Sequence, residues 1–344
     1  MIRPLPQGPA TRSRFLFVIA IVFAGLSAIY PTSAQQITSD VVISGATLHD
    51  QYELFAYCDD DGEFYRRPRA ARPGSQAVSI MRVAKGGSTL LFTLPPPEWA
   101  IEVLAPTAAG LAVLTKPFDA AGPVAGLMHM YRFDRQGHLQ TERSSLILDF
   151  QPVAMTETKS GMTVVVGYRS QTIEDKEVRT YGGAILNASN HVVKLFDFPP
   201  TSDGGNWAIG PFPRTTGGDR SASIILESGL DPIYSVASIS DSGEIHILPL
   251  ATVRGARSHD WFFGKGVAAE EYQFASDKPP SPIKIDAFDL TSGRKINTKV
   301  LPFLGFSVAC YLGNEISILA NTPHADKSRG LLPEMLRLVT VKFE

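Results

Sequence analysis

The sequence predicts an all-β protein, and three observations support that prediction. The chain of 344 residues contains 29 glycines and 25 prolines, which exceeds average usage and is expected of a chain with many turns. No stretch keeps apolar residues at helical spacing between two capping signals. Short β-rich runs recur instead, for example at residues 111–114, 163–166 and 223–226, and turn residues separate them.

One hairpin repeats along the chain at a nearly constant spacing. Each copy is a strand, a tight turn and a second strand, and the turn ends on a residue that tolerates positive φ. These residues are Gly86, Gly137, Asn190, Gly243 and Gly293, which lie 51, 53, 53 and 50 residues apart. A period near 50 with several strands per unit is typical of propeller blades.

An aromatic residue marks a second position, 13 to 18 residues after the last turn residue of each hairpin. We expect these aromatics to pack between blades, because large apolar side chains are usually buried. The marks are Tyr52, Trp99, Phe150, Trp207, Trp261 and Phe306. They divide the chain into six units, although a seventh is not excluded by this pattern. The units are 48–97, 98–148, 149–204, 205–258, 259–303 and 304–344.

Each unit reads as four strands, A to D, except that the last lacks strand D. Residues 40–48 are strand-like and remain unassigned at the other end of the chain. They would complete the last blade and close the ring, which removes an exposed sheet edge. The sequence therefore predicts a six-bladed β-propeller of four-stranded antiparallel blades, closed by an N-terminal strand, as a single domain over residues 35–344.

The chain resembles the β-propeller repeat superfamily over nearly all of residues 40–344. The clearest local match is Ala-Phe-Asp-Leu-Thr-Ser-Gly at residues 287–293, which is similar to the A-x-D-x-x-[TS]-G turn of quinoprotein-like and YVTN-like repeats. Those repeats continue to a Trp where this chain has Asn297. The resemblance therefore implies the fold and no pyrroloquinoline quinone site, and we expect no cofactor.

The first 34 residues have the pattern of a Sec-type signal peptide. Arg3, Arg12 and Arg14 precede an apolar run at residues 15–29, and small residues end at Ala34. We expect cleavage after Ala34 and a secreted or periplasmic protein; the alternative is an uncleaved N-terminal anchor. No later segment reaches membrane-spanning length, so we expect no membrane span after cleavage.

The two cysteines occupy equivalent positions in the first and last units. Cys58 lies four residues before Gly62, and Cys310 lies four residues before Asn314. These units are neighbours in a closed ring, and the expected compartment permits oxidation. One interpretation is a disulfide between Cys58 and Cys310; the other is two buried thiols, since equivalent positions on adjacent blades can exceed the separation of about 7 Å that a bridge allows.

The formal net charge of −2 and a pI near 6.4 give no electrostatic reason to expect nucleic acid as a partner. No local catalytic or metal-binding motif occurs, so the first hypothesis is a non-catalytic binding module that acts as a monomer. Its partner would be a protein, a glycan or a small ligand. The alternative is an extracytoplasmic propeller enzyme, such as a lactonase, a glycan-cleaving enzyme or a quinoprotein-type oxidoreductase.

The enzyme alternative needs polar residues that converge from several blades. The candidates are the residues that precede the aromatic marks, together with one histidine: Glu98, Asp149, Asn206, Asp260 and His259. A divalent metal is expected only under this alternative, because it would need several of these side chains around one point.

One face of the ring should carry the long connections. The B–C loops are expected at residues 66–77, 116–127, 169–180, 274–283 and 321–334, and the D–A connections join them there. Binding usually occurs on long loops of a rigid scaffold. Arginines in two of these connections are candidate ligand-binding residues for carboxylate or phosphate, or else a solvated loop surface. They are Arg66, Arg67, Arg69 and Arg72 in one and Arg254 and Arg257 in the other.

Overall fold

The computed structural model describes the larger part of the chain after Ala34 and consists of strands and their connections. No helix long and apolar enough to span a membrane occurs among the described residues. The described ranges are 35–43, 56–59, 61–66, 79–85, 87–119, 122–123, 126–202, 204–209, 215–218, 220–228, 233–252, 256–264, 266–274, 283–301, 308–322 and 335–343. The predicted signal peptide lies outside them.

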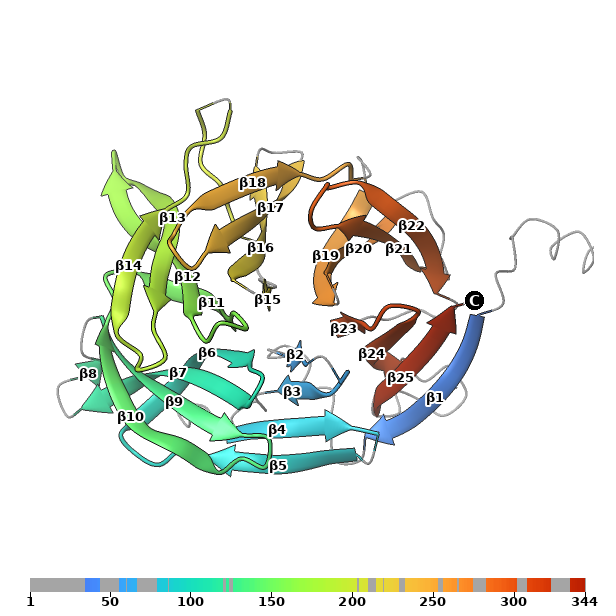
Figure 1. Ribbon diagram of the computed structural model, residues 1–344, viewed down its shortest axis with the longest axis horizontal. Coiled ribbons are helices and arrows are strands. Elements are labelled where there is room, and N and C mark those ends of the chain that lie inside the picture. Colours follow the sequence, from blue (N-terminus) through green and yellow to red (C-terminus); the bar gives the residue numbers. More distant parts are fainter. Residues whose placement is uncertain are drawn as a thin grey trace, which may run out of the picture.

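Six antiparallel sheets form the blades of a ring (Figure 1). Blade 1 contains β2 (Ala56–Cys58), β3 (Phe64–Arg66), β4 (Ser79–Ala84) and β5 (Gly87–Thr93). Blade 2 contains β6 (Glu98–Pro106), β7 (Gly110–Asp119), β9 (Leu127–Asp134) and β10 (Leu139–Ile147), with the short β8 (Gly122–Pro123) beside β7. Blade 3 contains β11 (Gln151–Glu157), β12 (Thr163–Ile173), β13 (Lys176–Leu186) and β14 (Val192–Asp197).

The second half of the ring repeats the same order. Blade 4 contains β15 (Thr215–Gly217), β16 (Ser221–Ser228), β17 (Ile233–Ser240) and β18 (Ile245–Pro249). Blade 5 contains β19 (Ala256–Gly264), β20 (Val267–Phe274), β21 (Ile283–Asp289) and β22 (Lys295–Leu301). Blade 6 contains β23 (Val308–Tyr311), β24 (Glu315–Thr322), β25 (Met335–Phe343) and β1 (Gln35–Ile43). The prediction of a six-bladed propeller is confirmed.

The hydrophobic core is divided among the six interfaces between neighbouring blades. For example, Val103 and Met128 of blade 2 pack with Val165 of blade 3 in one cluster. The last and first blades share a cluster as well, in which Leu319 and Leu338 meet Phe64. The aromatic marks belong to these cores where their side chains are described: Phe150 and Trp261 are buried, and Trp207 packs against the cluster between blades 3 and 4.

The N-terminal strand closes the ring as predicted, but at a different position. β1 spans Gln35–Ile43 rather than residues 40–48, and it pairs with β25 from Gln35↔Phe343 to Ile43↔Leu336. Residues 40–43 of the predicted segment belong to β1, and the pairing extends back to Gln35 because the full length of β25 sets the register; residues 44–48 lie outside the described part of the structure. The Arg337 guanidinium secures this pairing with two hydrogen bonds to the Asp40 carboxylate, at 2.8 and 2.5 Å.

A disulfide joins the innermost strands of the first and last blades. Cys58 on β2 and Cys310 on β23 are bonded, and their Cα atoms lie 5.9 Å apart. This separation lies within the range that a disulfide spans. The prediction of a bond between equivalent positions on adjacent blades is confirmed, so the ring is closed by strand pairing within blade 6 and by a covalent bond between blades 6 and 1.

The hairpin turns that repeat in the sequence join strands C and D within a blade, and they contact the outermost strand of the preceding blade. An asparagine or aspartate opens the turn in blades 2, 3 and 5 and accepts backbone N–H groups, as Asp134 Oδ1 does from Gln136 and His138 at 2.9 and 2.8 Å. Ser240 takes this position in blade 4. At its end Gly137 has φ of 85°, and a Cβ atom there would lie 2.4 Å from the Leu91 carbonyl oxygen of β5. The close approach to the sheet of the preceding blade, and not the turn alone, therefore requires glycine at this position.

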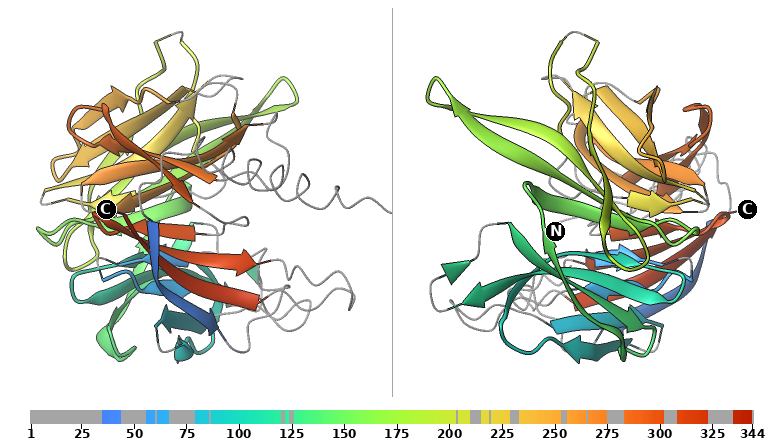
Figure 2. Two further views of the ribbon diagram at one scale, coloured as in Figure 1. Left: turned by 90° about the vertical axis from the view of Figure 1, so that its right-hand side faces the viewer. Right: turned by 60° about the vertical axis from the view of Figure 1, so that its left-hand side comes forward.

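Two predicted connections differ in the structure. Residues 169–180 form no irregular loop, because β12 and β13 pair without interruption from Thr163↔Leu186 to Ile173↔Lys176. Glu174 and Asp175 close this hairpin with φ of 49° and 59°, which is the two-residue turn that matches strand twist. Figure 2 shows the resulting two-stranded ribbon projecting from blade 3. In blade 4, Trp207 does not open the innermost strand: β15 starts at Thr215, and Ala208 forms only an isolated bridge with Glu227.

Candidate functional site

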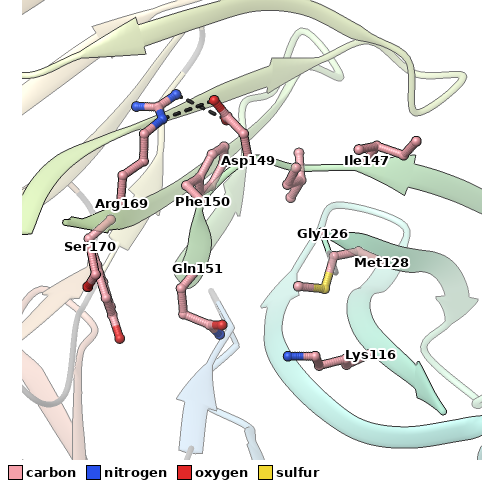
Figure 3. Close-up of a pocket in the computed structure, with 11 residues that line it drawn as sticks. Lys116, Gly126, Met128, Ile147, Asp149, Phe150, Gln151, Arg169 and Ser170 are labelled. Carbon is pink, nitrogen blue, oxygen red and sulfur yellow. Dashed lines mark hydrogen bonds and ion pairs between the residues drawn. The ribbon is translucent and has the colours of Figure 1, made fainter. Parts of the chain in front are cut away.

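A groove of about 610 Å³ lies between blades 2 and 3, on the face that carries the B–C and D–A connections (Figure 3). Its volume is within the range of small-molecule sites. Blade 2 contributes the end of β7, the start of β9 and the end of β10. Blade 3 contributes the start of β11 and the middle of β12. The lining residues are Lys116, Gly126, Met128, Ile147, Leu148, Asp149, Phe150, Gln151, Tyr168, Arg169 and Ser170.

The Arg169 side chain organises one wall of the groove. Its guanidinium donates to both Asp149 carboxylate oxygens, Nε at 3.0 Å and Nη2 at 3.1 Å, and to Asp197 Oδ1 through Nη1 at 2.6 Å. The hydrogen bonds from Arg169 lower the pKa of Asp149 below its usual value. The same guanidinium lies over the Phe150 ring, 5.8 Å from its centroid. Arg169 therefore ties the D–A connection to β12 and to the end of β14.

The opposite side of the groove is less charged. The Gln151 amide donates to Glu102 Oε2 at 2.8 Å, which links β11 to the innermost strand of blade 2. Met128 and Leu148 are each 2% exposed and belong to the core between the two blades, whereas Ile147 is 80% exposed. The groove thus offers an apolar floor with an exposed apolar edge.

Lys116 is the second cation among the described residues that line the groove. Its side chain is half-buried, and no ion pair joins it to an acid among the described residues. In Figure 3 it extends from β7 toward the side of the groove where Gln151 lies, apart from the Arg169–Asp149 pair. A lysine ammonium is a compact point charge with three donors, and it can therefore serve an incoming acceptor.

The β12–β13 ribbon rises from the rim of the groove. Tyr168 and Ser170 lie at its base, and the Arg179 guanidinium covers the Tyr168 ring at 4.5 Å from the centroid. Arg179 also donates to Glu177 Oε1 at 2.9 Å, and Ser170 donates to the same oxygen at 2.6 Å. These contacts hold the base of the ribbon in one arrangement beside the groove.

Glu98 lies in a second polar cluster, which is buried. Its carboxylate accepts hydrogen bonds from the Thr115 hydroxyl, from Tyr131 Oη at 2.6 Å and from His129 Nδ1 at 2.7 Å, and Arg143 lies 3.8 Å away. Burial alone would raise the pKa of Glu98, but these hydrogen bonds outweigh it and the pKa is lowered. Burial and the hydrogen bond to Glu98 raise the pKa of Tyr131 to about 12. The cluster is internally satisfied.

The structure does not bring the described candidate residues of the sequence analysis into one site. Glu98 is buried within blade 2, Asp149 lies in the groove and is paired with Arg169, and Asn206 is exposed ahead of blade 4. No group of three or more His, Cys, Asp or Glu side chains within the described ranges is arranged to hold a metal ion.

Several candidates lie outside the described part of the structure. Arg67, Arg69, Arg72 and Arg254 belong to ranges that the structure does not describe. Arg66 lies on β3, and Arg257, His259 and Asp260 lie on β19, but their side chains are outside the described part. For all of these residues the functional assignments stay predictions.

Sequence reasoning identified part of the groove and missed the rest. It singled out Asp149 and Phe150, and the predicted B–C loops began at Lys116 and Arg169. Gln151, Met128 and Tyr168 carried no signal of their own, because they are ordinary strand residues until the two blades meet. The signal in the sequence was the position at which the predicted B–C loops begin, because Lys116 and Arg169 both line the groove.

No protein-family model matches the chain, and no curated protein matches it by sequence. Solved structures match it by shape. A luciferin-regenerating enzyme aligns with a TM-score of 0.48 at 12% identity and covers 89% of this chain and 98% of its own. A protein of unknown function from Dyadobacter fermentans aligns with a TM-score of 0.52 at 14% identity and covers 90% of this chain and 99% of its own. At such identity the likeness of the second structure concerns the fold alone.

Proposed function

We propose that this protein is an extracytoplasmic binding module that takes a small ligand in the groove between blades 2 and 3. The observation that carries the proposal is the groove itself, about 610 Å³ in volume and lined by both apolar and polar side chains. Small-molecule sites typically combine an apolar lining with a few placed polar groups. The groove also lies on the face where the sequence places the long connections.

The walls of the groove are rigid enough to hold a defined ligand shape. Arg169 forms two hydrogen bonds to Asp149 in the D–A connection and one to Asp197 at the end of β14, and the Gln151 amide joins blade 3 to blade 2. Because these groups are already positioned, a ligand would not have to order them on binding, which lowers the entropic cost of association. The disulfide between Cys58 and Cys310 is consistent with the oxidising compartment that the proposal assumes.

The partners of the described acidic candidates also favour binding over catalysis. The Glu98 carboxylate is fully buried and accepts three hydrogen bonds, and the Asp149 carboxylate is paired with Arg169. A general acid or base must reach a substrate proton, and these two groups are engaged within the protein.

The test is methyl NMR on protein with labelled Ile and Met methyl groups, since Ile147 and Met128 lie in the groove. The probes are carboxylic acids, their amides, monosaccharides and short peptides, each at millimolar concentration. We expect at least one class to shift both groove methyl signals. The variant Ser170→Trp should abolish those shifts by filling the rim, because Ser170 is exposed and lines the groove.

The matched control is Ser242→Trp, at an exposed position in the C–D turn of blade 4, and it should leave the shifts unchanged. The proposal fails if none of the probes shifts the Ile147 and Met128 signals. It also fails if Ser170→Trp binds as well as the wild type.

A further inference from the structure

The two cations among the described residues that line the groove, Lys116 and Arg169, differ in their ion pairs. Arg169 is matched by Asp149 and Asp197, so its charge is neutralised by two carboxylates. Lys116 forms no ion pair within the described residues. Glu102, an acid on the adjoining strand β6, accepts the Gln151 amide instead. An incoming ligand therefore meets Lys116 as the donor that is free to pair with it.

The surroundings of Lys116 strengthen its attraction for an anion. The side chain is half-buried and lines the groove together with Met128 and Leu148, which are nearly inaccessible to solvent. The interaction between two charges grows as the local dielectric falls, so an anion at this position gains more than it would on an open surface. A neutral amide or hydroxyl would gain only an ordinary hydrogen bond.

The aromatic side chains of the groove argue against a ligand that stacks on exposed rings. Arg169 lies over the Phe150 ring at 5.8 Å and Arg179 lies over the Tyr168 ring at 4.5 Å. Phe150 is also 5% exposed. A guanidinium group thus occupies one face of each ring. The large exposed apolar side chain of the groove is Ile147 at the edge, and it suits an aliphatic or aromatic group of the ligand placed beside it.

We infer that the ligand of this groove is a carboxylate with an apolar body, and that Lys116 binds the carboxylate while Ile147 contacts the body. The inference rests on the proposed function, because it specifies the ligand of the same groove. Arg169 and Asp149 act as the framework that shapes the wall. The carboxylate belongs either to a free organic acid or to the C-terminus of a peptide.

The experiment compares acids with their matched amides in the same methyl NMR titration. The probes are 4-phenylbutyrate against 4-phenylbutyramide, and the peptide acetyl-Ala-Leu-Phe against its C-terminal amide. In the wild type we expect one or both acids to bind about tenfold or more tightly than the matched amide, which corresponds to about 1.4 kcal/mol. Added salt should weaken binding of the acid and leave the amide unchanged.

Variants of Lys116 identify the source of that preference. Lys116→Met keeps the length of the side chain and should make acid and amide equal. Lys116→Arg keeps the charge and should restore the preference for the acid. Lys342→Met, at an exposed lysine on β25 of blade 6, is the matched control and should behave as the wild type.

The outcomes separate this inference from the proposed function. If acid and amide bind equally to the wild type, or if Lys116→Met keeps the preference, the inference is overturned while groove binding stands. If no probe shifts the Ile147 and Met128 signals, both fall. Binding of the peptide acid without the free acid, or the reverse, supports the inference and identifies which source of carboxylate the groove accepts.

Discussion

Removing the Cys58–Cys310 disulfide is expected to lower the free energy of unfolding by several kcal/mol. The two cysteines are 252 residues apart, so the bond closes a loop of that length in the unfolded chain. The chain-entropy relation assigns about 5 kcal/mol to a loop of this size at 25 °C. Native disulfides typically contribute about 2–5 kcal/mol, and the length of this loop places the expected loss in the upper half of that range.

Two comparisons separate the cross-link from packing. Cys310 is 2% exposed and lies in the core shared by blades 6 and 1, so Cys58→Ala/Cys310→Ala also removes buried sulfur atoms. The reduced wild type keeps both sulfur atoms and lacks only the bond. We expect reduction of the wild type to account for most of the loss in the free energy of unfolding. The double variant should lose about 1–2 kcal/mol more than the reduced wild type.

Urea unfolding followed by tryptophan fluorescence measures both effects. Without the cross-link the unfolded chain is more expanded, so the dependence of the free energy on urea should become steeper as the midpoint falls. Equal midpoints for the oxidised and reduced wild type would refute the reasoning, because they would mean that strand pairing between β1 and β25 alone closes the ring.

Two further predictions concern the turns and the buried cluster. Gly137→Ala should destabilise the protein by about 2–4 kcal/mol, because a Cβ atom would lie 2.4 Å from the Leu91 carbonyl oxygen. Gly161→Ala, with nearly the same φ of 84° and no atom within 4 Å, should cost only about 1–2 kcal/mol in the same urea assay, and equal losses would contradict the close contact between blades. Glu98→Gln should cost about 2–4 kcal/mol at pH 7, because the buried carboxylate accepts three hydrogen bonds. The folded-state pKa of Glu98 lies below the ordinary value of 4.5, so its stabilisation is complete above that pH and is lost as pH falls through the lowered pKa. Wild type and Glu98→Gln should therefore converge in stability as the pH is lowered below 4.5, and a constant difference would contradict the assigned ionised state.

The repeat was readable from the sequence because its signals are local. A hairpin turn needs a residue at positive φ and an acceptor at its start, and both are visible as residue types at Gly137 and Asp134. The residue types of the β-rich runs, together with the turn residues between them, indicated the strands in the same way. The number of blades followed from the spacing of these turns. The equivalent positions of Cys58 and Cys310 in the first and last units then allowed the disulfide to be predicted from a ring.

Prediction was weaker where a segment depends on a partner distant in the chain. β1 was placed five residues too late because β25 sets its register. Residues 169–180 were expected to form a loop because they are polar. They form a ribbon instead, since backbone hydrogen bonds between β12 and β13 continue outward from the part of these strands that is packed in the blade. Glu98 was a candidate only as a polar residue before an aromatic mark, and no local pattern indicates its hydrogen-bond partners Thr115, His129 and Tyr131, which lie 17 to 33 residues away in the chain.

The sequence by itself determined the architecture: six repeated units, their turns, the closing strand and the placing of Cys58 and Cys310 on neighbouring blades. These depend on residue types at short or regular spacing, and local backbone preferences express them directly. Only the tertiary structure decided the groove. Lys116, Met128, Ile147 and Arg169 come from four strands of two blades, and their meeting depends on how the sheets pack and twist against each other. The same packing pairs Arg169 with two carboxylates and, within the described residues, leaves Lys116 without an ion pair, and no spacing in the chain encodes this difference.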